Sequence, residues 1–318
     1  MLKRLYRKKI LLCIIVIFSL FLIYLIPTKN DTNSIEEELV YVDKDVNTGE
    51  IYLLDSNNYL ARTEIVITKV DIEEKAKELI EALIIDGKMQ DSIPSGFKAI
   101  IPSNTKILNL KKYDNIIKVD FSKDLMNTTK ENEEKIIEAI TYTLTSLNDI
   151  NGVIIYMEGE LLNKLPQSKI NLPSTLTRNF GINKEYNITS TKDIEKTTIY
   201  YISTFNNKEY YVPVTKINND SRSKIEIIID ELSSNNVYKS NLMSYLNSNT
   251  KIISSNQVDD ELIVNFNNGI LNDINTNEIL EEVIYTVLMS INENYDVKSV
   301  IFNVDDKEIY KSVLKSLE

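Results

Sequence analysis

The sequence predicts an α+β protein made of two tandem small sandwich domains that follow an N-terminal transmembrane helix. Three observations lead to this prediction. Residues 10–26 form an uncharged apolar run. The segments NTKILN (104–109) and IKVDFS (117–122) recur as NTKIIS (249–254) and LIVNFN (262–267), each displaced by 145 residues. Each copy mixes strand and helix patterns without a strict strand–helix–strand alternation, which favours a sheet with two helices packed on one face.

The composition limits both the domain count and the chemistry. A chain of 318 residues suggests about two domains. A single cysteine, Cys13, excludes an internal disulfide framework, and the absence of histidine removes imidazole catalysis and histidine-ligated metal sites. The first 29 residues hold six of the 36 basic side chains and no acid, so residues 30–318 carry 30 basic and 47 acidic side chains, a net charge of −17. Such an acidic body would repel phosphate backbones and anionic lipid headgroups, so no nucleic-acid partner is expected.

The N-terminal segment has the pattern of a retained membrane anchor. Residues 1–9 (MLKRLYRKK) carry five basic side chains. Residues 10–26 can form a helix of about 25 Å, at the short end of what spans a bilayer. No small-residue cleavage site precedes Pro27, and leucines precede Cys13 where a lipobox would need small residues. We therefore predict a cytoplasmic basic tail at 1–9, a transmembrane signal anchor at 10–26, and a single-pass protein of the cell membrane whose bulk is extracytoplasmic.

A polar, acidic and aperiodic stretch at 28–48 is predicted to be a linker between the anchor and the first domain. The first domain is predicted at 49–160. It begins with two β-rich runs within residues 51–67 that flank Asp55–Asn58, a pattern that predicts a β-hairpin.

Two helices and three further strands complete the first domain. Asp71 with Glu74 predicts a capped helix start, and Gly87 predicts the end of that helix. Thr128 with Glu131 predicts the start of the second helix. The strands are predicted at 104–109, 117–122 and 153–157.

The second domain is predicted at 199–318, with the same order of elements. It starts with a hairpin at 199–217, and Ser221 can cap the helix that follows. A second helix near 278–291 places Ile284–Val287 opposite Thr141–Leu144 of the first copy. The remaining strands are predicted at 249–254, 262–267 and 300–304.

The residues between the two copies, 161–198, contain two prolines and one glycine and are predicted to be an inter-domain linker. Each copy has about 110 residues, which is enough to bury a core of its own. The chain is therefore expected to have undergone a tandem duplication.

Short motifs lie in a fixed order along the chain. Those in the first copy are Ile101–Pro102, Asn104–Leu108, Val119–Ser122, Tyr142–Thr145 and Met157–Gly159, and Leu176–Phe180 follows in the linker. As an ordered set they resemble the GerM (GerMN) domain family of sporulation and spore germination proteins, in which a Leu-Thr-Arg segment joins two such domains. The resemblance covers nearly all of residues 51–318.

The resemblance implies a non-catalytic bacterial envelope protein of sporulation or germination, with a fold similar to the ring-building domains of secretion machinery. It implies assembly through domain contacts between the mother-cell and forespore membranes. The implied partners are cell-envelope or sporulation-complex proteins. A homo-oligomer and a contact with peptidoglycan stay open. Many relatives are lipoproteins, whereas this chain is predicted to use a membrane helix.

A peptidoglycan-binding or peptidoglycan-remodelling protein, the latter a hydrolase, is the alternative. Asp120 on an alternating strand could act as a general acid or a metal ligand, but the second copy has Asn265 there, which cannot exchange a proton. Glu158 and Glu160 form a carboxylate pair, but residues two apart meet the separation of about 5–10 Å for glycoside hydrolysis in any turn. A hydrogen-bonded strand residue and a solvated turn are the favoured interpretations.

The remaining chemical candidates are weaker still. Ser122, Ser146 and Cys13 are nucleophiles by type, but the chain has no histidine to activate them. The acidic run Glu36–Glu38 is interpreted as solvated linker. The second copy also has Asn267 where the first has Ser122. No catalytic, cofactor-binding or metal-binding residue is predicted.

Tyrosines cluster in the second predicted hairpin, at Tyr200, Tyr201, Tyr210 and Tyr211. Some of them should face outward on a two-stranded ribbon, and exposed tyrosine is enriched at protein interfaces. We therefore select Tyr201 and Tyr211 as candidate interface residues. Packing against the helices of the same domain is the alternative, and the sequence does not decide between the two.

Overall fold

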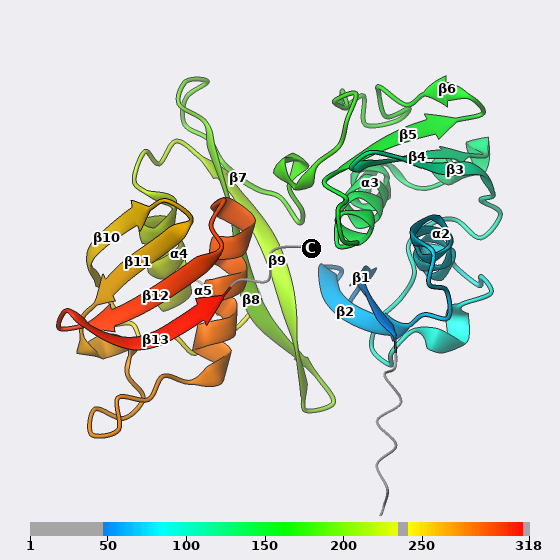
Figure 1. Ribbon diagram of the computed structural model, residues 1–318. Helices are drawn as coiled ribbons and strands as arrows, with labels where there is room; N and C mark the ends of the chain where they lie inside the picture. Colours follow the sequence, from blue (N-terminus) through cyan, green and yellow to red (C-terminus); the bar gives the residue numbers. More distant parts are fainter. Residues whose placement is uncertain (1–46, 235–240, 314–318) are drawn as a thin grey trace, which may run out of the picture. The chain divides into compact units, whose positions relative to one another are not determined.

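The computed structural model describes residues 47–234 and 241–313 (Figure 1). The predicted basic tail at 1–9, the predicted transmembrane helix at 10–26 and residues 28–46 of the predicted linker lie outside the described residues. Within the two described ranges, no helix is both long and apolar enough to cross a membrane. Helices and strands in these ranges form an α+β fold.

The first repeat opens with the predicted hairpin, which the structure confirms. Strands β1 and β2 are antiparallel, with Leu54 opposite Leu60. Asp55 closes the turn, because its Oδ1 accepts hydrogen bonds from the backbone N–H groups of Asn57 and Tyr59, both at 2.8 Å. The elements of this repeat are β1 (Thr48–Leu54), β2 (Leu60–Val66), α2 (Ile72–Leu83), β3 (Ile107–Tyr113), β4 (Ile116–Phe121), α3 (Lys130–Leu144), β5 (Gly152–Met157) and β6 (Glu160–Leu161), with short 3-10 helices η1 (Gln90–Ser92) and η2 (Lys123–Met126).

The second repeat has the same order of elements. We call the residues between β6 and the first strand of this repeat, 162–194, the connector. They include the 3-10 helix η3 (Arg178–Phe180) and the short strand β7 (Glu185–Asn187). The elements of the repeat are β8 (Glu195–Phe205), β9 (Lys208–Asn218), α4 (Lys224–Ser233), β10 (Ile252–Val258), β11 (Glu261–Phe266), η5 (Asn268–Ile270), α5 (Glu281–Asn294), β12 (Ser299–Val304) and β13 (Lys307–Val313).

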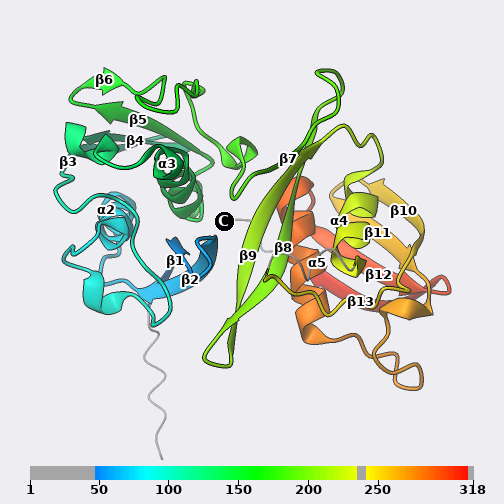
Figure 2. The ribbon, with the colours of Figure 1, turned by 180° about the vertical axis from the view of Figure 1, so that it is seen from behind.

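Each repeat contains a four-stranded sheet, a helix pair and a hairpin, whose arrangement is shown in Figures 1 and 2. The sheets have equivalent orders, β3-β4-β5-β6 and β10-β11-β12-β13, and in both the pairings run antiparallel, parallel and antiparallel. Helix α3 contacts both β5 and β1, and α2 contacts both β3 and β1. In the second repeat α4 contacts both β10 and β8, and α5 contacts β8. Two helices thus pack on a sheet as predicted, and the hairpin adds a further layer against the helices.

The two four-stranded sheets share a β-bulge at the same position in the repeat. The register of β3 against β4 shifts at Leu108, and that of β10 against β11 shifts at Ile253. These residues are 145 positions apart, and both side chains are exposed. An extra residue bends its strand and increases the local twist, so both sheets are deformed at equivalent points.

Strands from both repeats belong to one five-stranded sheet. Its order is β1-β2-β9-β7, in which β2 and β7 pair with different parts of one edge of β9. Strand β8 pairs with the opposite edge of β9 along its whole length. The two repeats meet where β2 pairs with β9 at Arg62 and Tyr211. The sequence did not predict this pairing, because apolar alternation shows which face of a strand is buried but not which strand lies at its edge.

Each repeat has its own hydrophobic core. In the first, the fully buried rings of Tyr52 and Tyr142 pack edge to face, with their centroids 5.3 Å apart. In the second, the rings of Phe266 and Phe302 pack in the same way, with the same distance between centroids. The connector also contributes to the first core, through the buried side chains of Leu162, Leu165, Leu172, Leu176 and Ile182.

The predicted start of α2 at Asp71 is confirmed, and the other three helix starts differ from the prediction by one to three residues. The N-cap of α3 is Thr129 rather than Thr128. The N-cap of α4 is Ser223 rather than Ser221, and it forms a capping box with Glu226. Neighbouring hydroxyl residues are equally suited to cap a helix, so local sequence does not distinguish them. Helix α5 spans Glu281–Asn294 instead of 278–291.

The predicted alignment of Ile284–Val287 with Thr141–Leu144 is wrong by four residues. Thr143 Oγ1 accepts a hydrogen bond from Tyr52 N at 3.1 Å. In the second repeat, Ser290 Oγ accepts the equivalent bond from Tyr200 N at 2.9 Å. Thr143 is therefore equivalent to Ser290 rather than to Thr286. A shift of four residues is about one helical turn and keeps the same face, so the apolar pattern could not fix the alignment.

Candidate functional site

Asp120, considered above as an acid or a metal ligand, fixes a turn. Its Oδ1 accepts a hydrogen bond from Gly159 N at 3.1 Å, in the turn between β5 and β6. In the second repeat, Asn265 Oδ1 accepts from Asp306 N at 3.4 Å, in the equivalent turn between β12 and β13. A carboxylate and an amide both accept such a bond, which is why either residue serves here.

Other residues of the shared motifs also bind backbone groups. Ser122 Oγ accepts from Lys106 N at 3.1 Å, and its counterpart Asn267 Oδ1 accepts from Lys251 N at 2.9 Å. Each contact joins the end of one strand to the segment that leads into its neighbour. The polar motif residues in both repeats therefore hold the backbone in place.

The remaining chemical candidates that the structure describes contact backbone groups. Glu158 Oε1 accepts from the backbone N–H of Lys123 at 3.0 Å. Ser146 Oγ donates to the backbone oxygens of Thr143 and Glu50, at 2.7 and 3.1 Å. Cys13 and Glu36–Glu38 lie outside the described residues. In the part of the chain that the structure describes, no group of three acidic, cysteine or histidine residues could hold a metal ion.

The candidate interface tyrosines lie in different environments. Tyr201 is only 2% exposed, and its hydroxyl donates to Glu231 Oε2 of α4 at 3.2 Å, so it cannot serve as an exposed interface residue. Its strand packs on α4, as the alternative interpretation expected. Tyr211 is half-buried, and its ring centroid lies 6.4 Å from that of Tyr285, which is 46% exposed.

The other two tyrosines of the hairpin bind the first repeat. Tyr210 is buried, and its hydroxyl donates to Asp55 Oδ2 in the turn of the first hairpin, at 2.9 Å. The hydroxyl oxygens of Tyr200 and Tyr52 are 3.1 Å apart. Tyr200 and Tyr210, which were not the residues selected, thus contact the other repeat of the same chain.

Arg178, in the Leu-Thr-Arg segment of the connector, binds carboxylates from both repeats. Its Nη1 donates to Glu293 Oε2 at 2.8 Å, and its Nη2 donates to Glu50 Oε1 at 3.4 Å. Its Nε donates to Thr145 Oγ1 at 3.1 Å, and its guanidinium carbon lies 4.9 Å from the ring centroid of Tyr142. A planar guanidinium with several donors is suited to bind carboxylates and aromatic faces together.

The hydroxyl groups of Tyr52 and Tyr200 complete this arrangement. Tyr52 donates to Glu50 Oε1 at 2.8 Å, and Tyr200 donates to Glu293 Oε2 at 3.3 Å. Burial alone would raise the pKa of Glu50, but Arg62 and Arg178 outweigh this effect and hold its pKa below the usual value. We call the following residues the Arg178 cluster: Glu50, Tyr52, Tyr142, Arg178, Tyr200 and Glu293.

A second connector residue, Asn183, joins β2 to β9. Its Oδ1 accepts from Leu60 N at 2.9 Å, and its Nδ2 donates to the backbone oxygens of Leu60 and Pro213, both at 2.8 Å. Pro213 has no backbone N–H to offer a neighbouring strand. The amide of Asn183 therefore supplies hydrogen bonds between the two repeats beside a proline in β9.

Glu138 of α3 anchors the connector at Asn183 and Lys184. Its Oε2 accepts from Asn183 N at 2.9 Å, and its Oε1 lies 3.3 Å from Lys184 Nζ. Burial raises the pKa of Glu138 to about 7, and Lys184 only partly opposes this. Lys184 also pairs with Glu134 at 2.7 Å.

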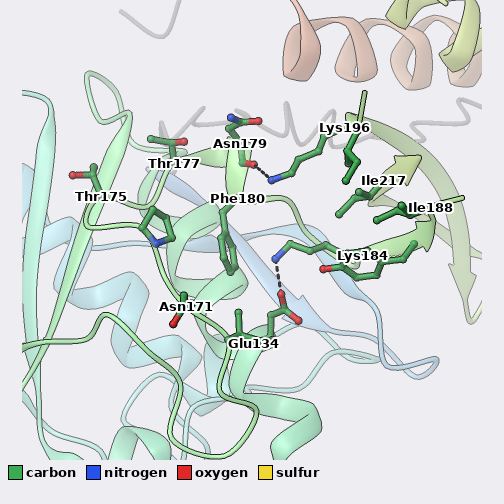
Figure 3. A pocket seen from close by; sticks show the side chains of 14 residues that line it. Glu134, Asn171, Thr175, Thr177, Asn179, Phe180, Lys184, Ile188, Lys196 and Ile217 are labelled. Atoms are coloured by element: carbon green, nitrogen blue, oxygen red, sulfur yellow. Dashed lines mark hydrogen bonds and ion pairs between the residues drawn. The ribbon is translucent and has the colours of Figure 1, made fainter. Parts of the chain in front are cut away.

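A cavity of about 630 Å3 lies between connector residues 170–180 and the strands that follow (Figure 3). Figure 3 shows Phe180 and Lys184 side by side in it, with Lys184 directed at Glu134. Lys196 Nζ donates to the backbone oxygen of Asn179 at 3.1 Å. We call this cavity the connector groove; its apolar lining includes Ile170, Pro173, Phe180, Tyr186, Ile188 and Ile194.

Comparison with known proteins finds the same repeats elsewhere. A family profile described as "Germane: Sporulation and spore germination" matches residues 50–163 and 198–310. The chain is 32% identical over 267 residues to the spore germination protein GerM of Bacillus subtilis (strain 168), and the match covers 81% of this chain and 71% of that protein. The solved structure of the tandem GerMN domains of the sporulation protein GerM from Bacillus subtilis has a TM-score of 0.74 and 30% identity, covering 82% of this chain and 92% of that one.

Proposed function

This chain belongs to the Germane family of sporulation and spore germination proteins, and we propose that it works as a membrane-anchored, extracytoplasmic assembly protein without catalytic activity. The predicted resemblance is confirmed, and it supports a role related to sporulation. Tandem GerMN domains and an α+β fold are likewise shared with the solved structure.

The main support for this proposal is the set of hydrogen bonds that the polar motif residues form. Asp120 and Asn265 fix equivalent turns, and Ser122 and Asn267 fix equivalent strand ends. Arg178 then binds both repeats at once. The side chains that were candidates for chemistry thus fix the backbone within each repeat, and Arg178 joins the two repeats, as a protein that acts through its surfaces requires.

The location of the protein is part of the proposal and rests on sequence. Five basic residues precede the apolar run at 10–26, and such flanks stay on the cytoplasmic side. A net charge of −17 over residues 30–318 would keep the body away from anionic headgroups. The expected partners are envelope or sporulation-complex proteins or further copies of this chain.

A double variant, Asp120→Asn with Glu158→Gln, tests the non-catalytic part. Both changes remove a carboxylate but keep an acceptor oxygen, so the backbone contacts at Gly159 and Lys123 can persist. We expect the full-length double variant to restore sporulation and germination to a deletion strain as well as the wild-type chain does.

The purified full-length wild-type protein is also expected to release no muropeptides from cortex or wall peptidoglycan. Release of muropeptides that the double variant abolishes would contradict the proposal, because loss of a catalytic carboxylate lowers rates by orders of magnitude. In sporulating cells, crosslinking of the wild-type chain should capture envelope or sporulation-complex proteins or further copies of itself. Binding to peptidoglycan without any captured protein would favour a wall-binding module instead.

A further inference from the structure

We propose that the connector groove binds an extended segment of a partner protein that has aliphatic side chains and at least one carboxylate. This inference rests on the proposed function, since it specifies the kind of partner that an assembly protein would hold. Three features of the groove support this inference: its apolar walls, the strand edge beside them and the charge of its lysines.

The apolar walls of the groove are partly open to solvent. Tyr186 is 62% exposed, Ile188 41% and Ile194 42%, and all three line the groove. Ile170 and Pro173 line the same cavity from the connector. Large apolar side chains gathered in one concave site indicate a place where another molecule binds.

The edge of β7 defines the conformation of the bound segment. This strand (Glu185–Asn187) stands at the end of the order β1-β2-β9-β7, so among the described residues only β9 pairs with it. The free edge of a strand presents backbone N–H and C=O groups that an extended peptide can pair with. Tyr186 lies on β7 itself, so a peptide added at this edge would place alternate side chains against the groove.

The charge of the groove defines the polar group. Lys184 is already paired with Glu134 and Glu138. Lys196 has no ion pair with any residue in the described ranges, and it donates to the backbone oxygen of Asn179. Burial and the nearby charge of Lys184 lower the pKa of Lys196, which means that its charged form lacks a compensating anion. A carboxylate would supply that anion.

Binding of three synthetic peptides to the full-length protein, followed by fluorescence anisotropy, tests the proposal. The peptides alternate valine with glutamate, with glutamine or with lysine. We expect the valine–glutamate peptide to bind at least ~10-fold more tightly than the valine–lysine peptide. Lys196→Glu should reverse this preference, and Ile194→Ser should weaken binding of the valine–glutamate peptide.

The matched control is Lys208→Glu, which makes the same charge change on an exposed residue of β9 away from the groove lining. This variant should bind like the wild-type chain. The proposal is overturned if the three peptides bind equally, if none binds, or if Lys208→Glu alters the preference as much as Lys196→Glu does. A concentration-dependent dimer that Tyr186→Ser dissociates would overturn it in favour of a second copy of this chain.

The outcome for the groove is separable from the outcome for the proposed function. If no peptide binds but crosslinking in sporulating cells still captures envelope proteins, the groove proposal fails and the assembly role stands. Release of muropeptides would defeat the assembly role whatever the peptides do.

Discussion

Arg178 lies in the connector, yet its guanidinium binds Glu50 of the first repeat and Glu293 of the second. The Glu293 side chain is 4% exposed and that of Arg178 is 25% exposed, so this pair is more protected from water than an ordinary surface pair. The sequence identified the Leu-Thr-Arg segment only as a motif between two domains. It could not show what Arg178 binds, because its partners are 128 and 115 residues away in the chain.

Replacing Arg178 by alanine should destabilise the full chain by about 2–3 kcal/mol. Removing one partner of a buried ion pair costs roughly 3–5 kcal/mol because it strands the opposite charge, and the partial exposure of Arg178 lowers this figure. The measurement is the free energy of unfolding in urea at neutral pH.

The matched control for Arg178 is Arg222→Ala. Arg222 also pairs with two carboxylates, those of Asp220 and Asp230, but its side chain is 49% exposed. An exposed pair contributes roughly 0–1 kcal/mol. Equal losses in the two variants would show that the Arg178 cluster has no special role in stability.

Glu138 should make stability depend on pH. Its folded-state pKa of about 7 lies above the ordinary value of 4.5, so folding favours the protonated form. This contribution is fully present below pH 4.5 and is lost as the pH rises through 7, up to about 3 kcal/mol. Lys184 and Glu134 face the same site and set the remaining charge.

Urea unfolding between pH 5 and 8 measures this effect. Glu138→Gln mimics the neutral acid and should flatten the fall in stability over that window. Glu160→Gln, which removes an exposed carboxylate, should leave the slope as in the wild-type chain. An unchanged slope in Glu138→Gln would mean that this residue does not titrate in the window.

At the scale of elements, local patterns predicted most of the fold. The hairpin at 51–67 and the strands near 117–122, 153–157 and 300–304 are confirmed, because alternation and turn residues act locally. Strands β6 and β13 were missed, since each simply follows a tight turn. The pairing of β2 with β9 was also missed, because nothing in either strand encodes a partner in the other repeat.

Asn183 offers a test of that missed pairing. It has a positive φ of 47°, so Asn183→Gly keeps the backbone conformation and removes only the amide. We expect a loss of about 2–3 kcal/mol, because three hydrogen bonds between β2, the connector and β9 disappear. Hydrogen exchange at the Leu60 amide should become faster.

The control for Asn183 is Asn207→Gly in the turn of the second hairpin. Asn207 has a similar φ of 61° but is exposed, so its replacement should change stability by less than about 0.5 kcal/mol. If Asn183→Gly is no more harmful than Asn207→Gly, the amide does not join the repeats.

At the scale of the whole molecule, the described residues 47–234 and 241–313 belong to one compact unit although they contain two hydrophobic cores. The sequence predicted separate domains at 49–160 and 199–318, and these limits stay a proposal. What the sequence could not supply was the junction, which is built from the Arg178 cluster, Asn183 and the pairing of β2 with β9. A surface that presents both repeats to a partner depends on that junction.

The claim that the two repeats act as one body is tested most directly by unfolding them with a separate reporter in each. The chain has no tryptophan, so Tyr113→Trp in β3 and Tyr285→Trp in α5, made in two full-length proteins, report on one repeat each. Both positions are exposed, at 54% and 46%, so the substitutions should be tolerated. We predict that the two urea midpoints coincide, and that they separate when Arg178→Ala is added. Two clearly different midpoints with Arg178 intact would contradict the account, because the repeats would then unfold independently.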